Sequence, residues 1–178
     1  GSDREPGTGG QYGLNLRWLA HGLADTEFGL YYLNYHSRLP LISGTAVTSG
    51  AANSARVYFE YPEDIHLFGG SFNTSIESLG LAVQGELSHR SNQPLQLDDV
   101  EVLFLALSPL NRLIPQPVNR FISQLGVTTP GADVRGYARH PLSQWQFTAT
   151  RAFGQVFGAG QLAWVTEVGG TKVWDLPD

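Results

Sequence analysis

The amino-acid sequence predicts an all-β protein, folded as an antiparallel up-and-down meander of about six long strands. Two observations predict this fold. Apolar and polar residues alternate with a period of two over stretches of about 9 to 12 residues, which is the pattern of a strand with one apolar and one polar face. Short polar or glycine-containing connections join neighbouring stretches into hairpins. The chain of 178 residues is long enough for one domain, which we expect to span residues 1–178.

The clearest alternation lies in the segment LGLAVQGELSHR, residues 79–90. Its leucines and Val83 fall on one face, with Gly85 between them, and its polar residues fall on the other face. The remaining predicted strands cover residues 11–19, 28–36, 66–76, 144–153 and 161–170. Strands of this length match the roughly 9–11 residues that cross a bilayer at a tilt.

The connections between these strands differ in length. Three are short (24–27, 77–78 and 154–160) and two are long (37–65 and 91–143). Successive connections of a meander lie at opposite ends, so the short ones share one end and the long ones share the other. This asymmetry is typical of outer-membrane β-barrels. Because a barrel of that type needs at least about eight strands, we expect the chain to be a fragment of a longer barrel.

The longer loop, 91–143, contains the expected helical segment. Residues 97–114 begin with Asp98 or Asp99 as a helix N-cap. A second short helix is expected over 117–127, with Pro117 in its first turn and Gly126 as its C-cap.

Composition excludes several function classes. The net charge of −5 argues against a nucleic-acid partner, which normally requires a basic face. The chain has no cysteine, so neither a disulfide framework nor a thiolate metal site is available. No apolar run approaches the roughly 18 residues of a membrane-spanning helix.

Four segments carry a resemblance to a known family. They are FGLYYLNYHSRLPLISG (28–44), YFEYPEDIHLFGGSFNTSI (58–76), GLAVQGELSHRSNQPLQLDDVEVLFLALSPL (80–110) and QFTATRAFGQVFGAGQLAWVTEVGGTKVWDLP (146–177). They resemble the DUF1302 family of Gram-negative bacterial proteins, and the NYHSRLP and EYPEDI motifs are distinctive. The resemblance implies an outer-membrane β-barrel of several hundred residues and poorly defined function, of which this chain is an interior portion. It also implies a periplasmic DUF1329-type partner and the movement of hydrophobic molecules, and it supplies no catalytic residues.

Polar residues on the strands form the first candidate site. The set expected to line the barrel lumen is Asn15, Arg17, Gln84, Glu86, Ser88, Arg90 and Glu167. We expect its two arginines to pair with its two glutamates in a cross-strand charge ladder. Two interpretations stay open: charge pairs that stiffen a filled interior, and a polar conduit.

Aromatic residues form the second candidate set. Tyr12, Trp18, Tyr31, Tyr35, Trp145 and Trp164 are expected in interfacial girdles, where an amphipathic ring has one apolar and one wet side. The alternative is that they are ordinary core aromatics.

Catalytic chemistry has only weak candidates, His36 and Ser37 in the NYHSRLP motif. Neighbouring strand residues point to opposite faces, which prevents the hydrogen bond that activates a serine. The alternative is that Asn34, His36 and Arg38 fix the start of the following loop. No histidine pair has metal-ligand spacing, and we expect no metal and no cofactor.

Three functions therefore stay open. The leading hypothesis is a segment of an outer-membrane barrel that contacts the lipid bilayer and binds or moves a hydrophobic small molecule. The second is an outer-membrane or secreted esterase or lipase that uses His36. The third is a soluble lipocalin-like module whose apolar strand faces surround a cavity.

Overall fold

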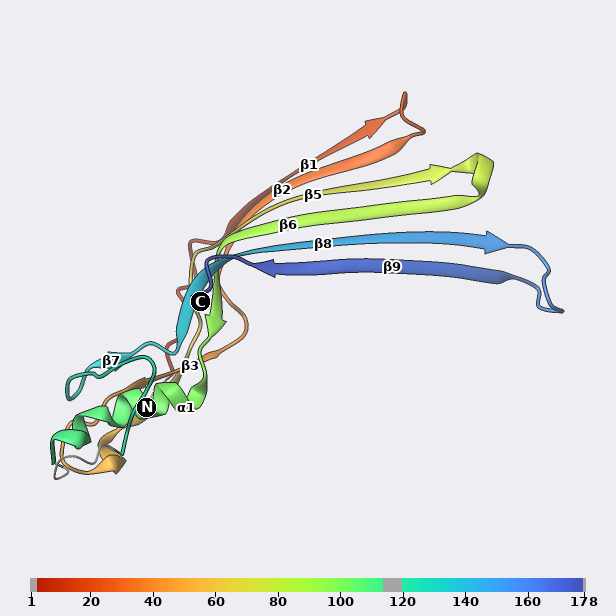
Figure 1. Ribbon diagram of the computed structural model, residues 1–178. Helices are drawn as coiled ribbons and strands as arrows, with labels where there is room; N and C mark the ends of the chain where they lie inside the picture. The colour runs from red at the N-terminus through yellow and green to blue at the C-terminus, as the bar shows by residue number, and fades with distance from the viewer. Residues whose placement is uncertain (1–2, 114–119, 178) are drawn as a thin grey trace. The chain divides into compact units, whose positions relative to one another are not determined.

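The computed structural model describes residues 3–113 and 120–177 (Figure 1). By residue contacts, the chain divides into two compact units. The small-sheet unit comprises residues 1–10, 36–64 and 94–139. The long-strand unit comprises residues 11–35, 65–93 and 140–178.

The long-strand unit is built on one antiparallel sheet of six strands in the order β1-β2-β5-β6-β8-β9. Its strands are β1 (Tyr12–Ala20), β2 (Thr26–Tyr35), β5 (Ile65–Ile76), β6 (Leu81–Gln96), β8 (Tyr137–Phe153) and β9 (Leu162–Val173). The order in the sheet follows the order in the chain, which confirms the predicted meander. The sheet is open, because β1 and β9 each have one neighbouring strand. The last residues of β6 and the first of β8 belong to the small-sheet unit.

The three short connections lie at one end of this sheet (Figure 1). They are residues 21–25 between β1 and β2, η2 (Glu77–Leu79) with Gly80 between β5 and β6, and residues 154–161 between β8 and β9. Each contains residues in the left-handed region, such as Asp25 at φ 50° and Gly80 at φ 57°. A positive φ lets the chain reverse within a few residues. The predicted sorting of connections by length is thus confirmed for this sheet.

The two long connections, predicted over 37–65 and 91–143, contain strands as well as the helical segment expected in the second of them. They contain a second sheet of three strands in the order β4-β3-β7. Its strands are β3 (Leu41–Thr45), β4 (Arg56–Glu60) and β7 (Asp133–Val134). These strands are too short to display a sustained alternation, and β7 pairs with a strand far away in the sequence. Periodicity alone therefore did not reveal them.

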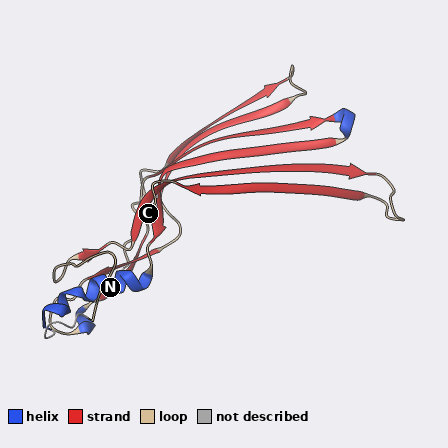
Figure 2. Ribbon diagram, in the orientation of Figure 1, coloured by secondary structure: helices blue, strands red, loops and turns tan. Residues whose placement is uncertain are grey.

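Helical segments gather in the small-sheet unit, apart from η2 (Figure 2). They are η1 (Ala52–Ser54), α1 (Asp99–Leu107) and η3 (Ser108–Leu113). The core of this unit forms where α1 packs on the small sheet, with Ala46, Val102, Ala106 and Val134 all buried. Among the described residues, no helix is long and apolar enough to cross a membrane.

Asp98, one of the two N-cap candidates that the sequence offered, caps α1. Its Oδ1 accepts hydrogen bonds from the amides of Val100 at 2.9 Å and Glu101 at 3.2 Å. These amides have no partner within the helix, so the side chain satisfies two of the four free N–H groups.

We expect Asp98→Ala to destabilise α1 by about 1 kcal/mol, because it removes this cap. Hydrogen exchange at the Val102 amide, which donates to the Asp98 carbonyl, measures the effect. Asp99→Ala is the matched control, since Asp99 lies in the first turn without being the cap. Equal acceleration of exchange in both variants would contradict a capping role.

The predicted second helix over 117–127 is wrong for its described part, residues 120–127. Residues 117–119 lie outside the described residues. Ser123 and Gly126 form an isolated β-bridge instead. Side chains of the first helical segment hold this stretch: Glu101 accepts from the Ser123 hydroxyl at 2.7 Å and from the Gln124 amide at 2.6 Å. Amides engaged in this way do not form helical hydrogen bonds.

Candidate functional site

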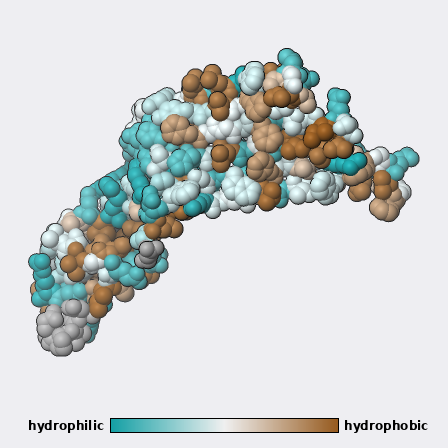
Figure 3. Space-filling model, turned by 45° about the horizontal axis from the view of Figure 1, so that its top comes forward, coloured by the Kyte–Doolittle hydropathy of each residue, from teal (hydrophilic) through white to brown (hydrophobic). Residues whose placement is uncertain are grey.

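The strand register gives the six-stranded sheet two distinct faces. Residues opposite one another on paired strands point to the same face, so the pairs Trp18–Phe28 and Phe28–Phe72 place these rings together. The apolar face carries Tyr12, Leu14, Leu16, Trp18, Phe28, Leu30, Tyr32, Phe68, Phe72, Leu81, Val83, Leu87, Trp145, Phe147, Leu162, Trp164 and Val168. Hydrophobic side chains are visibly exposed over the long strands in Figure 3.

The apolar face is continuous because a glycine makes room for two rings. A Cβ on Gly85 would lie 2.4 Å from the Phe72 ring and 2.8 Å from the Phe147 ring. The two rings therefore meet over the backbone of β6, with centroids 6.0 Å apart. Leu30 and Leu87 nevertheless remain 63% and 59% exposed. Among the described residues of the long-strand unit, no second layer covers this face.

All seven residues predicted to line a lumen lie on the opposite, polar face. Tyr31 of β2 reaches over Gly69 of β5, and its hydroxyl donates to Glu86 Oε1 of β6 at 2.6 Å. Arg90 Nε donates to the Tyr35 hydroxyl at 3.1 Å, and its Nη1 donates to Gln144. Hydrogen bonds thus cross β2, β6 and β8 on one side of the sheet.

The predicted charge ladder does not form among the described residues. Arg17 pairs with Glu27 at 3.7 Å across the β1–β2 hairpin, and Arg90 binds neutral partners. The sheet order explains the difference. Arg17 and Glu86 are three strands apart, which is about 14 Å at 4.8 Å per strand and too far for an ion pair.

Four of the six predicted interfacial aromatics lie on the apolar face, toward its two ends. Trp18 follows Tyr12 by six residues along β1 and lies nearer the short connections. On the β8–β9 hairpin, Trp164 of β9 lies opposite Arg151 of β8. Arg151 follows Trp145 by six residues, so Trp164 lies nearer the short connections than Trp145 does. Each spacing corresponds to about 20 Å along a strand.

Tyr31 and Tyr35 lie instead on the polar face, which corrects the expectation that all six aromatics share one environment. Their hydroxyls are engaged by Glu86 and Arg90, as described above. Residues 28–36 carry aromatic and apolar side chains on both faces, so periodicity could not separate the two sets.

The weak catalytic candidates, His36 and Ser37, bind backbone atoms rather than each other. His36 is 4% exposed, and its Nδ1 accepts from the Asp64 amide at 3.1 Å. Its proton is therefore on Nε2, which lies 2.8 Å from the Gly9 carbonyl and donates to it. The Ser37 hydroxyl donates to the Leu39 carbonyl at 2.8 Å. These contacts fix the backbone around residues 9, 39 and 64, and none of them joins His36 to Ser37.

The model of the family described as "Protein of unknown function (DUF1302)" matches residues 1–178. The chain belongs to the DUF1302 family. Searches of curated proteins and of solved structures found no match to the chain.

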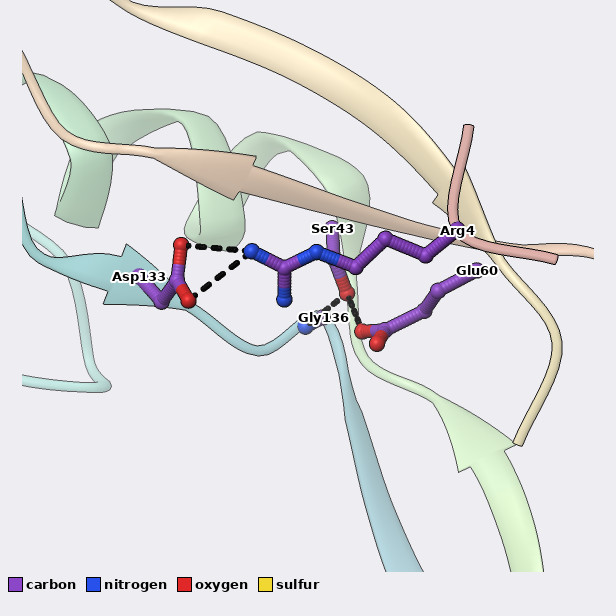
Figure 4. A network of polar contacts seen from close by, with 5 residues as sticks. All are labelled: Arg4, Ser43, Glu60, Asp133 and Gly136. Carbon is purple, nitrogen blue, oxygen red and sulfur yellow. Dashed lines mark hydrogen bonds and ion pairs between the residues drawn. The ribbon is translucent and has the colours of Figure 1, made fainter. Parts of the chain in front are cut away.

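The DUF1302 chain also contains a polar network in the small-sheet unit that sequence reasoning missed (Figure 4). Arg4 Nη2 lies 3.0 Å and 2.9 Å from the two carboxylate oxygens of Asp133. Its guanidinium also lies 4.3 Å from the ring centroid of Tyr58. Ser43 donates to Glu60 and accepts from the Gly136 amide at 2.8 Å. Arg4 and Asp133 are 129 residues apart, so no local pattern signals their contact.

This network is structural in character. The hydrogen bond to Asp133 raises the pKa of Arg4, and burial raises the pKa of Tyr58. Both shifts favour the forms already present at neutral pH, a charged arginine and a neutral tyrosine. Among the described residues of the DUF1302 chain, no group of three or more histidine or carboxylate side chains could hold a metal ion.

Proposed function

We propose that the six-stranded sheet is a segment of the wall of an outer-membrane β-barrel that binds or moves hydrophobic compounds. Its apolar face contacts lipid, and its polar face lines the lumen. The observation that supports this most is the exposed apolar face, ending in aromatic residues at both ends and backed by a hydrogen-bonded polar face.

Exposure of the apolar face supports lipid contact. Soluble proteins cover the apolar face of a sheet with another layer, and large exposed apolar patches mark interaction surfaces. Within the long-strand unit, Trp18 is 64% and Leu16 is 59% exposed. Hydrocarbon chains remove such side chains from water without a second protein layer.

The aromatic spacing supports the same arrangement. Barrel exteriors carry an apolar band about 25 Å tall between two aromatic girdles. Tyr12 and Trp18 bound the apolar residues Leu14 and Leu16 on β1. Their separation of about 20 Å along the strand is of that order.

The hydrophobic-compound part of the proposal has one structural support. A hollow of about 530 Å³ lies on the apolar face, with Trp18, Phe28, Leu30, Phe72 and Phe147 among its lining residues. Such a surface suits an apolar group, since it offers aromatic and aliphatic contact and few hydrogen-bonding atoms.

Tryptophan fluorescence in lipid vesicles tests the proposal, because Trp18, Trp145 and Trp164 all lie on the apolar face. We expect brominated phosphatidylcholine to quench the emission of the reconstituted chain, and aqueous acrylamide to quench it weakly. The membrane assignment would be contradicted if the chain were monodisperse without detergent and its tryptophan emission were quenched by acrylamide but not by brominated lipid. That result would favour the soluble alternative.

A further inference from the structure

The charged residues of the six long strands are divided unequally between the two faces. In the described part of the long-strand unit, the strand carboxylates Glu27, Glu86 and Glu167 all lie on the polar face. Among the described residues of this unit, the apolar face carries two charged side chains, Arg151 and Lys172, and both are cations. The apolar face of the described strands of this unit therefore has positive charge and no strand carboxylate to balance it.

The two cations lie toward opposite ends of the apolar face. Arg151 is two residues from the end of β8, near the short connections, and lies opposite Trp164. Lys172 is the residue before the end of β9, at the other end, and lies opposite Ser143. The stretch of β9 between Trp164 and Lys172 contains no charge on this face.

Each cation rests on an aromatic ring. The Arg151 guanidinium lies 4.7 Å from the ring centroid of Phe153, and Lys172 Nζ lies 3.7 Å from that of Trp174. Both cations remain exposed. Neither has an ion-pair partner among the described residues, although Asp175 follows Trp174 in the chain.

The end with Lys172 carries further hydrogen-bonding groups. Trp174 Nε1 donates to the Ser143 hydroxyl at 3.0 Å, and that hydroxyl lies 2.9 Å from His89 Nδ1. On the neighbouring strands, the Tyr32 hydroxyl lies 2.9 Å from His66 Nδ1. These groups form a polar belt that borders the apolar residues, and none of them is a carboxylate.

We propose that Lys172 and Arg151 bind the phosphates of anionic lipid headgroups, one at each surface of the membrane. The inference rests on the proposed function, because it requires the apolar face to lie in lipid. A cation at the end of an apolar face reaches the headgroup level while its stem and its aromatic neighbour stay in the apolar layer. The absence of carboxylates from this face of the described strands makes it complementary to negative charge.

Vesicle binding tests this assignment. The full chain and its variants are added to vesicles of phosphatidylcholine alone and to vesicles of equimolar phosphatidylcholine and phosphatidylglycerol, and the bound fraction is measured by flotation. A cation near an anionic surface contributes about fivefold to binding. We expect Lys172→Gln and Arg151→Gln each to lower binding to the anionic vesicles by about fivefold, with little change on neutral vesicles.

Two variants serve as controls. Arg17→Gln removes the same charge from the polar face, where Arg17 is also exposed, and should leave the preference for anionic vesicles intact. Lys172→Arg keeps the charge and should keep the preference as well. Circular dichroism verifies that each variant retains its strand content, and excess inorganic phosphate should not displace the chain if intact headgroups are the ligand.

The outcomes separate the two proposals. Binding to both vesicle types with no preference for the anionic one would overturn the headgroup assignment. It would not contradict the proposal that the sheet is part of a barrel wall. An equal loss in Arg17→Gln and Lys172→Gln would also overturn it, since charge on either face would then act alike. Failure to bind either vesicle type would overturn both proposals, and displacement by inorganic phosphate would show a free-phosphate site instead of a lipid one.

Discussion

We expect Leu87→Arg to destabilise the long-strand unit in lipid, because the proposed function places Leu87 against the bilayer. Leu87 lies on the apolar face, opposite Gly70 of β5, and is 59% exposed. An arginine on the lipid face of a barrel costs roughly 2–4 kcal/mol near the bilayer midplane. A urea titration of the chain refolded into phosphatidylcholine vesicles, followed by circular dichroism, measures this loss.

Gln84→Arg is the matched control for this experiment. Gln84 lies on the same strand but on the polar face, opposite Asn73, where an arginine head remains in a polar environment. We expect the unfolding midpoint of this variant to stay close to that of the unmodified chain. Equal losses at positions 84 and 87 would refute the assignment of the two faces.

Replacing Gly136 with alanine should disrupt the small-sheet unit. A Cβ at this position would lie 1.6 Å from the Ile42 carbonyl oxygen, so the backbone of β3 would have to move. The Gly136 carbonyl accepts a hydrogen bond from the Leu97 amide at 2.8 Å, and the Gly136 amide donates to the Ser43 hydroxyl at 2.8 Å. Overpacking of this kind costs typically 1–3 kcal/mol, and a clash with backbone belongs at the upper end.

Hydrogen exchange at the Ala46 and Val47 amides measures this effect, because both are buried and bonded within the unit. We expect their exchange to accelerate by about two orders of magnitude in Gly136→Ala, the equivalent of roughly 3 kcal/mol. Gly9→Ala is the control, since nothing lies within 4 Å of a Cβ there. Unchanged protection in Gly136→Ala would show that β3 can shift without loss.

The sequence by itself determined the six long strands, the pairing within each of the three hairpins, and the two faces of strands such as 11–19 and 79–90, but not those of 28–36. Alternation over nine or more residues is a local property, and a short turn leaves only the next strand as a partner. The predicted strand at 161–170, for example, is observed as Leu162–Val173. The seven residues that were predicted to line a lumen share one face of the sheet. The cap at Asp98 was predictable for the same reason, since its partners are two and three residues away.

Only the tertiary structure decided the small sheet and the partners of individual side chains. The order of strands in the sheet separates Arg17 from Glu86 and brings Tyr31 to Glu86. Alternation along one strand shows that these side chains share a face but does not show which of them meet. The contact between Arg4 and Asp133 likewise joins residues 129 positions apart. Local periodicity tells which way a side chain points, whereas its partner depends on strand neighbours and on segments that meet only after the chain has folded.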